Sequence, residues 1–182
     1  MRRSEAVVLG ALGVALAAVA AVGAEGPALK EVMPKGMLLG VAVSQSHVEE
    51  KDAAAAALVT RHFDSITPEN LLKWEAVHPE PARYNFAPAD ALLAFGETRK
   101  MTVIGHTLVW HSQTPAWVFA GKEGAALDRE TALARMREHI QAVVGRYKGR
   151  IKGWDVVNEA INDDAEGSMR KSKWQQAIGD DY

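Results

Sequence analysis

The sequence contains no cysteine among its 182 residues. It can therefore form no disulfide, and it offers no thiolate to a structural metal centre. It also lacks an excess of charge of either sign, with 21 Lys and Arg against 23 Asp and Glu. A mixed, weakly acidic surface argues against nucleic acid as a partner. A chain without disulfides or a thiolate metal centre must be held together by a hydrophobic core, and this chain is long enough to form one.

Nucleotide-binding loops are absent as well. Neither a Gly-x-Gly-x-x-Gly pattern nor a Walker pattern occurs in the sequence, so nothing indicates a nucleotide cofactor. No internal repeat is visible, and low complexity is confined to the N-terminal run and to the alanines at 53–57. The remaining sequence therefore favours one domain of mixed composition.

The N-terminal segment is an uncharged apolar run, residues 6–24, that follows Arg2 and Arg3. It ends in small residues, Val22-Gly23-Ala24, of the kind that a signal peptidase accepts. A retained membrane anchor is the alternative, because the run is nearly long enough to span a bilayer. We expect a signal peptide at 1–24, a mature domain at 25–182, a secreted or periplasmic location, and no stable membrane association after cleavage.

Short apolar segments alternate with segments of helical pattern along the rest of the chain. Buried strands are predicted at residues 37–43, 63–66, 102–106 and 151–158, and helices at 49–63, 88–100 and 129–147. This alternation predicts a parallel α/β sheet. Two architectures satisfy it, a doubly wound open sheet and a (β/α) barrel.

Polar residues at the ends of the predicted strands distinguish the two architectures. Glu69 and Asn70 follow the second strand, His106 ends the third, and Asn158 and Glu159 end the fourth. A barrel builds its site from groups that successive strand ends supply, whereas a doubly wound sheet concentrates its site at a switch point. The pattern therefore favours the barrel.

The segment GWDVVNEA at 153–160 is apolar in its body and ends in an amide and a carboxylate. Burying a carboxylate is costly unless something compensates for it. Partial desolvation at a barrel rim would favour the protonated form of Glu159, which suits proton donation to a leaving-group oxygen. Asn158 can both donate and accept, as binding a sugar hydroxyl requires. The alternative is a structural ion pair of Glu159 with Lys73 or Arg150.

The segment GHTLVWHSQ at 105–113 places two histidines, an indole and an amide close together. Sugars are bound by such mixtures, because an apolar sugar face stacks on Trp while polar groups meet the hydroxyls. Metal binding is one alternative, but His106 and His111 lack the i, i+4 spacing of a helical zinc pair. A plain core role is the other alternative, and it is favoured for Trp117 and Trp174.

The segment TPENLLKW at 67–74 gathers Glu69, Asn70 and Lys73 within five positions. These side chains can form a polar clamp for hydroxyl groups, with Lys73 neutralising Glu69. The same composition is also typical of an ordinary solvated helix start, so this segment is the weakest of the three.

Together, the segments ITPENLLKW (66–74), GHTLVWHSQTPAW (105–117) and GWDVVNEA (153–160) resemble glycoside hydrolase family 10, the endo-β-1,4-xylanases. The similarity runs from about residue 38 to the last residue. It implies a (β/α)8 barrel that hydrolyses xylan or xylo-oligosaccharides with retention, as a monomer when full length. No metal or organic cofactor is implied.

The resemblance also assigns roles to individual residues. Glu159 matches the general acid/base, and Asn158 matches the amide that binds the 2-hydroxyl beside the cleaved bond. His106 and Trp110 match residues lining the subsite of the cleaved sugar. Four residues match contacts on the glycone side: Glu69, Asn70, Lys73 and Gln113.

One catalytic group is missing from these matches. A retaining glycosidase needs a carboxylate nucleophile about 5 Å from the acid/base, and the resemblance places it on a later strand. Asp155 lies four residues before Glu159, roughly 13 Å along the strand, and Asp163 and Asp164 lie in the next loop. We expect the chain to be the N-terminal half of a longer xylanase, about four of eight βα units, and inactive alone.

Three other readings remain open at this point. A non-catalytic remnant would bind xylo-oligosaccharides through residues such as Trp110, Lys73 and Asn70 without cleaving them. Another retaining barrel glycosidase, such as a cellulase, shares the Asn-Glu strand end, although the other two segments argue against it. A metal-dependent hydrolase is the least favoured.

Overall fold

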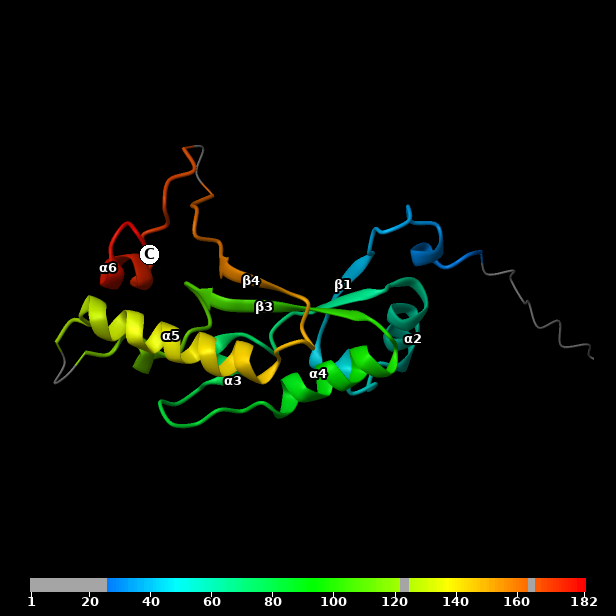
Figure 1. Ribbon diagram of the computed structural model, residues 1–182, viewed down its shortest axis with the longest axis horizontal. Helices are drawn as coiled ribbons and strands as arrows, with labels where there is room; N and C mark the ends of the chain where they lie inside the picture. The colour runs from blue at the N-terminus through cyan, green and yellow to red at the C-terminus, as the bar shows by residue number, and fades with distance from the viewer. Residues whose placement is uncertain (1–25, 122–124, 164–165) are drawn as a thin grey trace, which may run out of the picture.

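The structure is a computed structural model that describes residues 26–121, 125–163 and 166–182 (Figure 1). The predicted signal peptide at 1–24 lies outside the described residues. Within the described ranges, no helix combines the length and the hydropathy that crossing a membrane requires.

Four parallel strands form the sheet of the molecule. They are β1 (Gly40–Val43), β2 (Ser65–Pro68), β3 (Thr102–Trp110) and β4 (Gly153–Asn158). Consecutive strands in the chain pair with each other. A strand order equal to the chain order is that of a barrel, because a doubly wound sheet reverses its order at the switch point. The fold is therefore half of a (β/α)8 barrel, as predicted.

Helices connect the strands and cover one side of the sheet. The α-helices are α1 (Gln45–Val48), α2 (Ala53–His62), α3 (Trp74–Val77), α4 (Ala87–Thr98), α5 (Arg129–Arg146) and α6 (Lys173–Ile178), and two 3₁₀ helices are η1 (Leu29–Glu31) and η2 (Ala116–Phe119). Figure 1 shows α4 and α5 running along the same side of the sheet. This leaves the carboxyl ends of the strands to be lined by loops.

Several element bounds differ from the predictions. The helix predicted at 49–63 is α2 alone, which begins only at Ala53 because Asp52 accepts a hydrogen bond from the amide of Ala55 (3.0 Å) and caps it. The short helix α1 precedes the predicted range and was not predicted. β3 continues to Trp110 rather than ending at His106. The short helices α3 and α6 were not predicted, since four to six residues carry too little periodicity.

The hydrophobic core lies between the sheet and the helices α4 and α5. Its fully buried side chains include Ile66, Leu92, Leu93, Val103 and Val143. Gly96 lets α4 approach the sheet closely, because a Cβ at this position would lie 2.7 Å from Val103 Cγ2. Dense packing of this kind holds the ends of β2 and β3 in fixed positions.

β4 is not the buried strand that its apolar sequence predicts. Val156 is 52% exposed and Val157 is 44% exposed, because β4 has a neighbouring strand on one side only. Its attachment to β3 is nevertheless close. Trp154 lies in register with Gly105, where a Cβ would come within 2.1 Å of the indole ring.

Candidate active site

The carboxylate of Glu159 is the centre of the candidate site. Trp110 ends β3 in register with Asn158, the last residue of β4, and Glu159 follows directly. The indole Nε1 of Trp110 donates a hydrogen bond to Glu159 Oε2 (2.8 Å), and His111 Nε2 lies 3.8 Å from the same oxygen. The carboxylate side chain is 50% exposed, so it is fixed in direction and open to solvent.

A second group of polar side chains lies beside the ring of Trp110. The ammonium of Lys73 lies 4.4 Å from the centroid of the Trp110 ring and donates to Asn70 Oδ1 (3.0 Å). Gln113 Nε2 donates to the same Asn70 oxygen (3.3 Å). Cation–π attraction and the shared acceptor tie the loops after β2 and β3 together.

The charge of Lys73 is set by opposing effects. Partial burial lowers the pKa of its ammonium, while the negative charges of Glu159 and Glu69 act to raise it. Lys73 therefore brings a positive charge near the proposed proton donor without forming a direct ion pair with it in the contacts observed.

The remaining predicted site residues lie at the same rim but outside this network. His106 Nδ1 lies 3.0 Å from Asp155 Oδ2, so this histidine is tied to the middle of β4. Glu69 is exposed, and its backbone amide donates to Val43 O (2.9 Å) at the end of β1. Asn158 is placed by its register with Trp110. The sequence prediction that three strand ends converge is thus realised in space.

The alternative prediction of an ion pair between Glu159 and Arg150 is wrong, because Arg150 binds Glu97 instead (2.7 Å). Among the described residues there is no group of three or more His, Asp or Glu side chains arranged to hold a metal ion.

Three further residues of the site were not predicted as site residues from the sequence. Thr114 Oγ1 (2.9 Å) and Trp174 Nε1 (3.1 Å) both donate to the carbonyl of Trp110, and Arg170 Nε donates to the carbonyl of Glu159 (2.9 Å). Trp174 had been interpreted as a plain core tryptophan, and it is indeed fully buried. Thr114 lies only four residues after Trp110, within the segment at 105–117. Trp174 and Arg170 are far from their partners in the sequence, so no local pattern could have identified their contacts.

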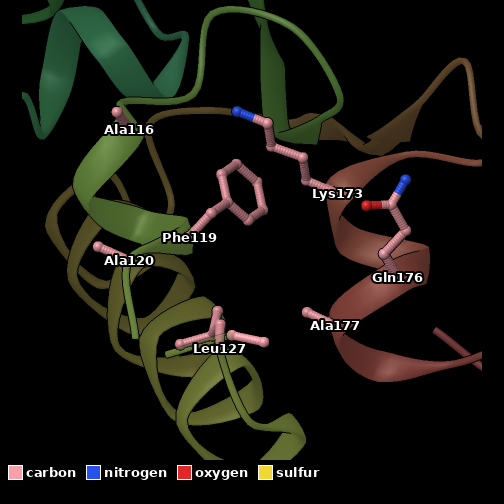
Figure 2. A pocket seen from close by; sticks show the side chains of 8 residues that line it. Ala116, Phe119, Ala120, Leu127, Lys173, Gln176 and Ala177 are labelled. Atoms are coloured by element: carbon pink, nitrogen blue, oxygen red, sulfur yellow. The ribbon is translucent and has the colours of Figure 1, made fainter. Parts of the chain in front are cut away.

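A cavity of about 360 Å³ lies apart from these residues, between η2 and α6. Phe119 and Leu127 form apolar walls, and Lys173 and Gln176 extend from α6 toward it, as Figure 2 shows. The Lys173 ammonium lies 5.5 Å from the centroid of the Phe119 ring. None of the side chains that contact Glu159 lines this cavity.

The chain is similar to known glycosidases over nearly all of its described length. Residues 28–182 match the model of glycosyl hydrolase family 10. An endo-1,4-β-xylanase A of Xylanibacter ruminicola is 46% identical over 171 residues, which are 94% of this chain and 46% of that protein.

Solved structures agree with this similarity. The crystal structure of an endo-1,4-β-xylanase from Caldicellulosiruptor owensensis has a TM-score of 0.78 at 42% identity, over 86% of this chain and 46% of that one. An intracellular xylanase from Thermoanaerobacterium saccharolyticum has a TM-score of 0.80 at 36% identity, over 87% and 50%. The chain spans about half the length of the relatives it matches. It belongs to glycosyl hydrolase family 10.

Proposed function

We propose that the chain forms the part of a retaining endo-1,4-β-xylanase that supplies the general acid/base and the glycone-side contacts. The observation that carries this proposal is the Glu159 carboxylate held by Trp110 Nε1, with the Lys73 ammonium on the same indole. The names of the relatives, which are xylanases, support xylan or xylo-oligosaccharides as the substrate.

In this proposal Glu159 donates a proton to the leaving-group oxygen and later removes a proton from the attacking water. The Trp110 hydrogen bond aims the carboxyl group at the bond to be cleaved. The nucleophile that forms the glycosyl-enzyme intermediate must be a second carboxylate about 5 Å away. Asp155 is tied to His106 and does not suit that role, so the proposal places the nucleophile on a later strand of the whole barrel.

Sugar binding in this proposal uses Trp110 and the polar groups around it. The indole presents an apolar face to a sugar ring, and the amides and the ammonium around it meet the hydroxyls. The residues assigned to these contacts are Glu69, Asn70, Lys73, His106, Gln113 and Asn158.

Export is a separate part of the proposal. Residues 1–24 act as a signal peptide, which places the domain at 25–182 outside the cytoplasm. The relatives do not fix the compartment, since one of them is an intracellular enzyme. Sequencing the N-terminus of the protein recovered from the culture medium or periplasm tests this point: an intact Met1 would contradict it.

A hybrid enzyme tests the catalytic proposal. Residues 28–182 replace the matching segment of the Caldicellulosiruptor owensensis xylanase, whose remaining strands complete the barrel. We expect the hybrid to release reducing sugar from xylan, and Glu159→Gln to lower kcat by about 10²- to 10⁴-fold. The Glu75→Gln variant serves as control, because Glu75 is an exposed glutamate on α3.

Two results would contradict the proposal. The first is a hybrid that folds, as judged by circular dichroism, and cleaves a β-1,4-glucan but not xylan. The second is full activity in the Glu159→Gln hybrid.

A further inference from the structure

The chain after β4 turns back on itself next to Glu159. Ile161 forms an antiparallel bridge with Met169, and Asn162 N donates to Ser168 O (2.8 Å). Arg170 N donates to Ala160 O (2.8 Å), which closes the return at the end of the strand. Arg170 therefore comes back to the position from which the loop departs.

The guanidinium of Arg170 binds three oxygens at this closure. It donates to the carbonyls of Glu159 (2.9 Å) and Ile161 (3.3 Å) and to the carboxylate of Asp163 (3.1 Å). Its side chain is 22% exposed, against 94% for Asp163. A planar guanidinium can bridge several oxygens at fixed angles, which a lysine ammonium does less well.

The backbone that Arg170 holds is an unusual one. Glu159 has φ +53°, in the left-handed region that residues with a Cβ rarely adopt. Such a conformation persists only where surrounding contacts hold it, and it is found preferentially at functional sites. The carbonyl of the same residue is the one that Arg170 binds, and its side chain is the one that Trp110 binds.

We propose that Arg170 is a positioning residue for Glu159. By binding the Glu159 carbonyl it keeps the backbone left-handed, and this conformation directs the carboxylate to the indole Nε1 of Trp110. Arg170 acts on the main chain and does not contact the substrate. The effect of Arg170 on catalysis rests on the proposed function. The geometric relation between Arg170, Glu159 and Trp110 does not depend on that function.

The first test observes the Trp110 indole proton by NMR in the 182-residue chain, with Trp110→Phe to assign the resonance. We expect Arg170→Gln to shift this resonance upfield and to speed its exchange with solvent, because the bond to the carboxylate is lost. The other indole resonances should change little. Asp163→Asn, which removes only the carboxylate partner of Arg170, should produce a smaller change in the same direction.

Arg135 provides a matched control. Its Nη1 also binds three oxygens, the carbonyls of Trp117 (3.0 Å), Val118 (2.8 Å) and Ala120 (2.9 Å), but it lies beside η2 rather than beside Glu159. Arg135→Gln should leave the Trp110 resonance in place. An unchanged Trp110 resonance in Arg170→Gln, or an equal change in Arg135→Gln, would overturn the proposal.

The second test measures kinetics in the hybrid xylanase. Arg170→Gln should lower kcat by about 10- to 100-fold, the effect of misplacing a catalytic group, while KM is unchanged because substrate contacts remain. Arg170→Lys should recover part of the loss. A rise in KM with unchanged kcat would overturn the positioning role. An unmodified hybrid that folds and cleaves a β-1,4-glucan but not xylan would refute the proposed function, and the NMR result would still decide the role of Arg170.

Discussion

The absence of a side chain at Gly105 allows β3 and β4 to pack closely. The indole of Trp154 on β4 lies where a Cβ of residue 105 would be, at 2.1 Å from Cε3. The two residues are in register, so the indole covers β3 at this point. The position of β4, and with it that of Glu159, depends on this contact.

Gly105→Ala should therefore destabilise the protein by about 1–3 kcal/mol, because the added methyl group forces the indole or the strand to move. Gly145→Ala is the control, since Gly145 lies in α5 with no atom within 4 Å of an added Cβ. It should stabilise the protein by about 0.5–1 kcal/mol. Urea unfolding measures both, and similar effects of the two substitutions would refute the argument.

His139 on α5 is fully buried in a stack of rings. Its ring lies 3.8 Å from that of Trp74, and its Nδ1 lies 3.4 Å from Nδ1 of His78. Burial, and secondarily the neighbouring His78, lower the pKa of His139 to about 3. Burial also lowers the pKa of His78, although a backbone contact and the charge of Glu138 oppose this.

Because His139 is buried in its neutral form, the protein should become less stable at acid pH. Below the unfolded-state pKa of about 6.5, the unfolded chain binds a proton at His139 that the folded chain does not. The free energy of unfolding should therefore fall, by about 1 kcal/mol per pH unit, as the pH drops from about 6.5 toward 3. His139→Phe, which keeps an aromatic ring in the stack, should flatten this dependence in urea unfolding measured from pH 7 to 4. Parallel curves for the two proteins would contradict the prediction.

At the scale of the elements, two ion pairs connect α4 with the end of α5 and the residues after it. Asp90 accepts from Arg146 Nη2 (2.5 Å) and from the hydroxyl of Tyr147 (3.0 Å), which is buried. Hydrogen bonding from Arg146, partly opposed by burial, lowers the pKa of the Asp90 carboxyl. Glu97 binds Arg150 (2.7 Å) in a pair about as exposed as Arg146 and Asp90, but no buried hydroxyl of the described residues shares it.

The two pairs should differ in their contribution to stability. Asp90→Asn should lower the melting temperature by about 2–5 °C, because the buried Tyr147 hydroxyl loses its charged acceptor. Glu97→Gln should lower it by less than about 2 °C, since exposed pairs contribute little. Calorimetry of the two variants side by side compares their melting temperatures. A larger decrease for Glu97→Gln would show that the buried Tyr147 hydroxyl does not determine the difference.

The sequence predicted the order of strands and longer helices well, because each has a local pattern of apolar residues. It also predicted that the polar segments near Asn70, Trp110 and Glu159 converge, since the carboxyl ends of parallel strands meet at one edge. Burial of β4 was predicted wrongly, because burial depends on the neighbours of a strand and not on its own composition. The contacts of Arg170 and Trp174 were missed because their partners lie far from them in the sequence.

At the scale of the whole molecule, the sheet has two unpaired edges among the described residues, at β1 and β4. Apolar side chains are exposed beside both edges: Met37, Leu38, Val156, Val157 and Ile161. An open edge with apolar neighbours is a template for pairing with another chain. The 182-residue chain should consequently self-associate when studied by itself.

Charge on β4 should suppress this association. Val156→Glu places a carboxylate on the exposed edge strand, where it costs little because the side chain is already 52% exposed. Sedimentation velocity at increasing protein concentration should show larger species for the unmodified chain and fewer for the variant. Leu58→Glu, on the equally exposed surface of α2, is the control and should not reduce association. A monomeric unmodified chain would contradict this prediction.

The order β1-β2-β3-β4 has a further consequence for how the protein is made. Each strand after β1 pairs with the strand synthesised before it. None of these strands therefore has to insert between two strands that are already paired. At about 5–20 residues per second, β3 is complete some seconds before β4 emerges. In a chain that folds from its N-terminus as it emerges, Trp110 would therefore be in the sheet before Glu159 arrives, and the direction of emergence would set the order in which the site is assembled.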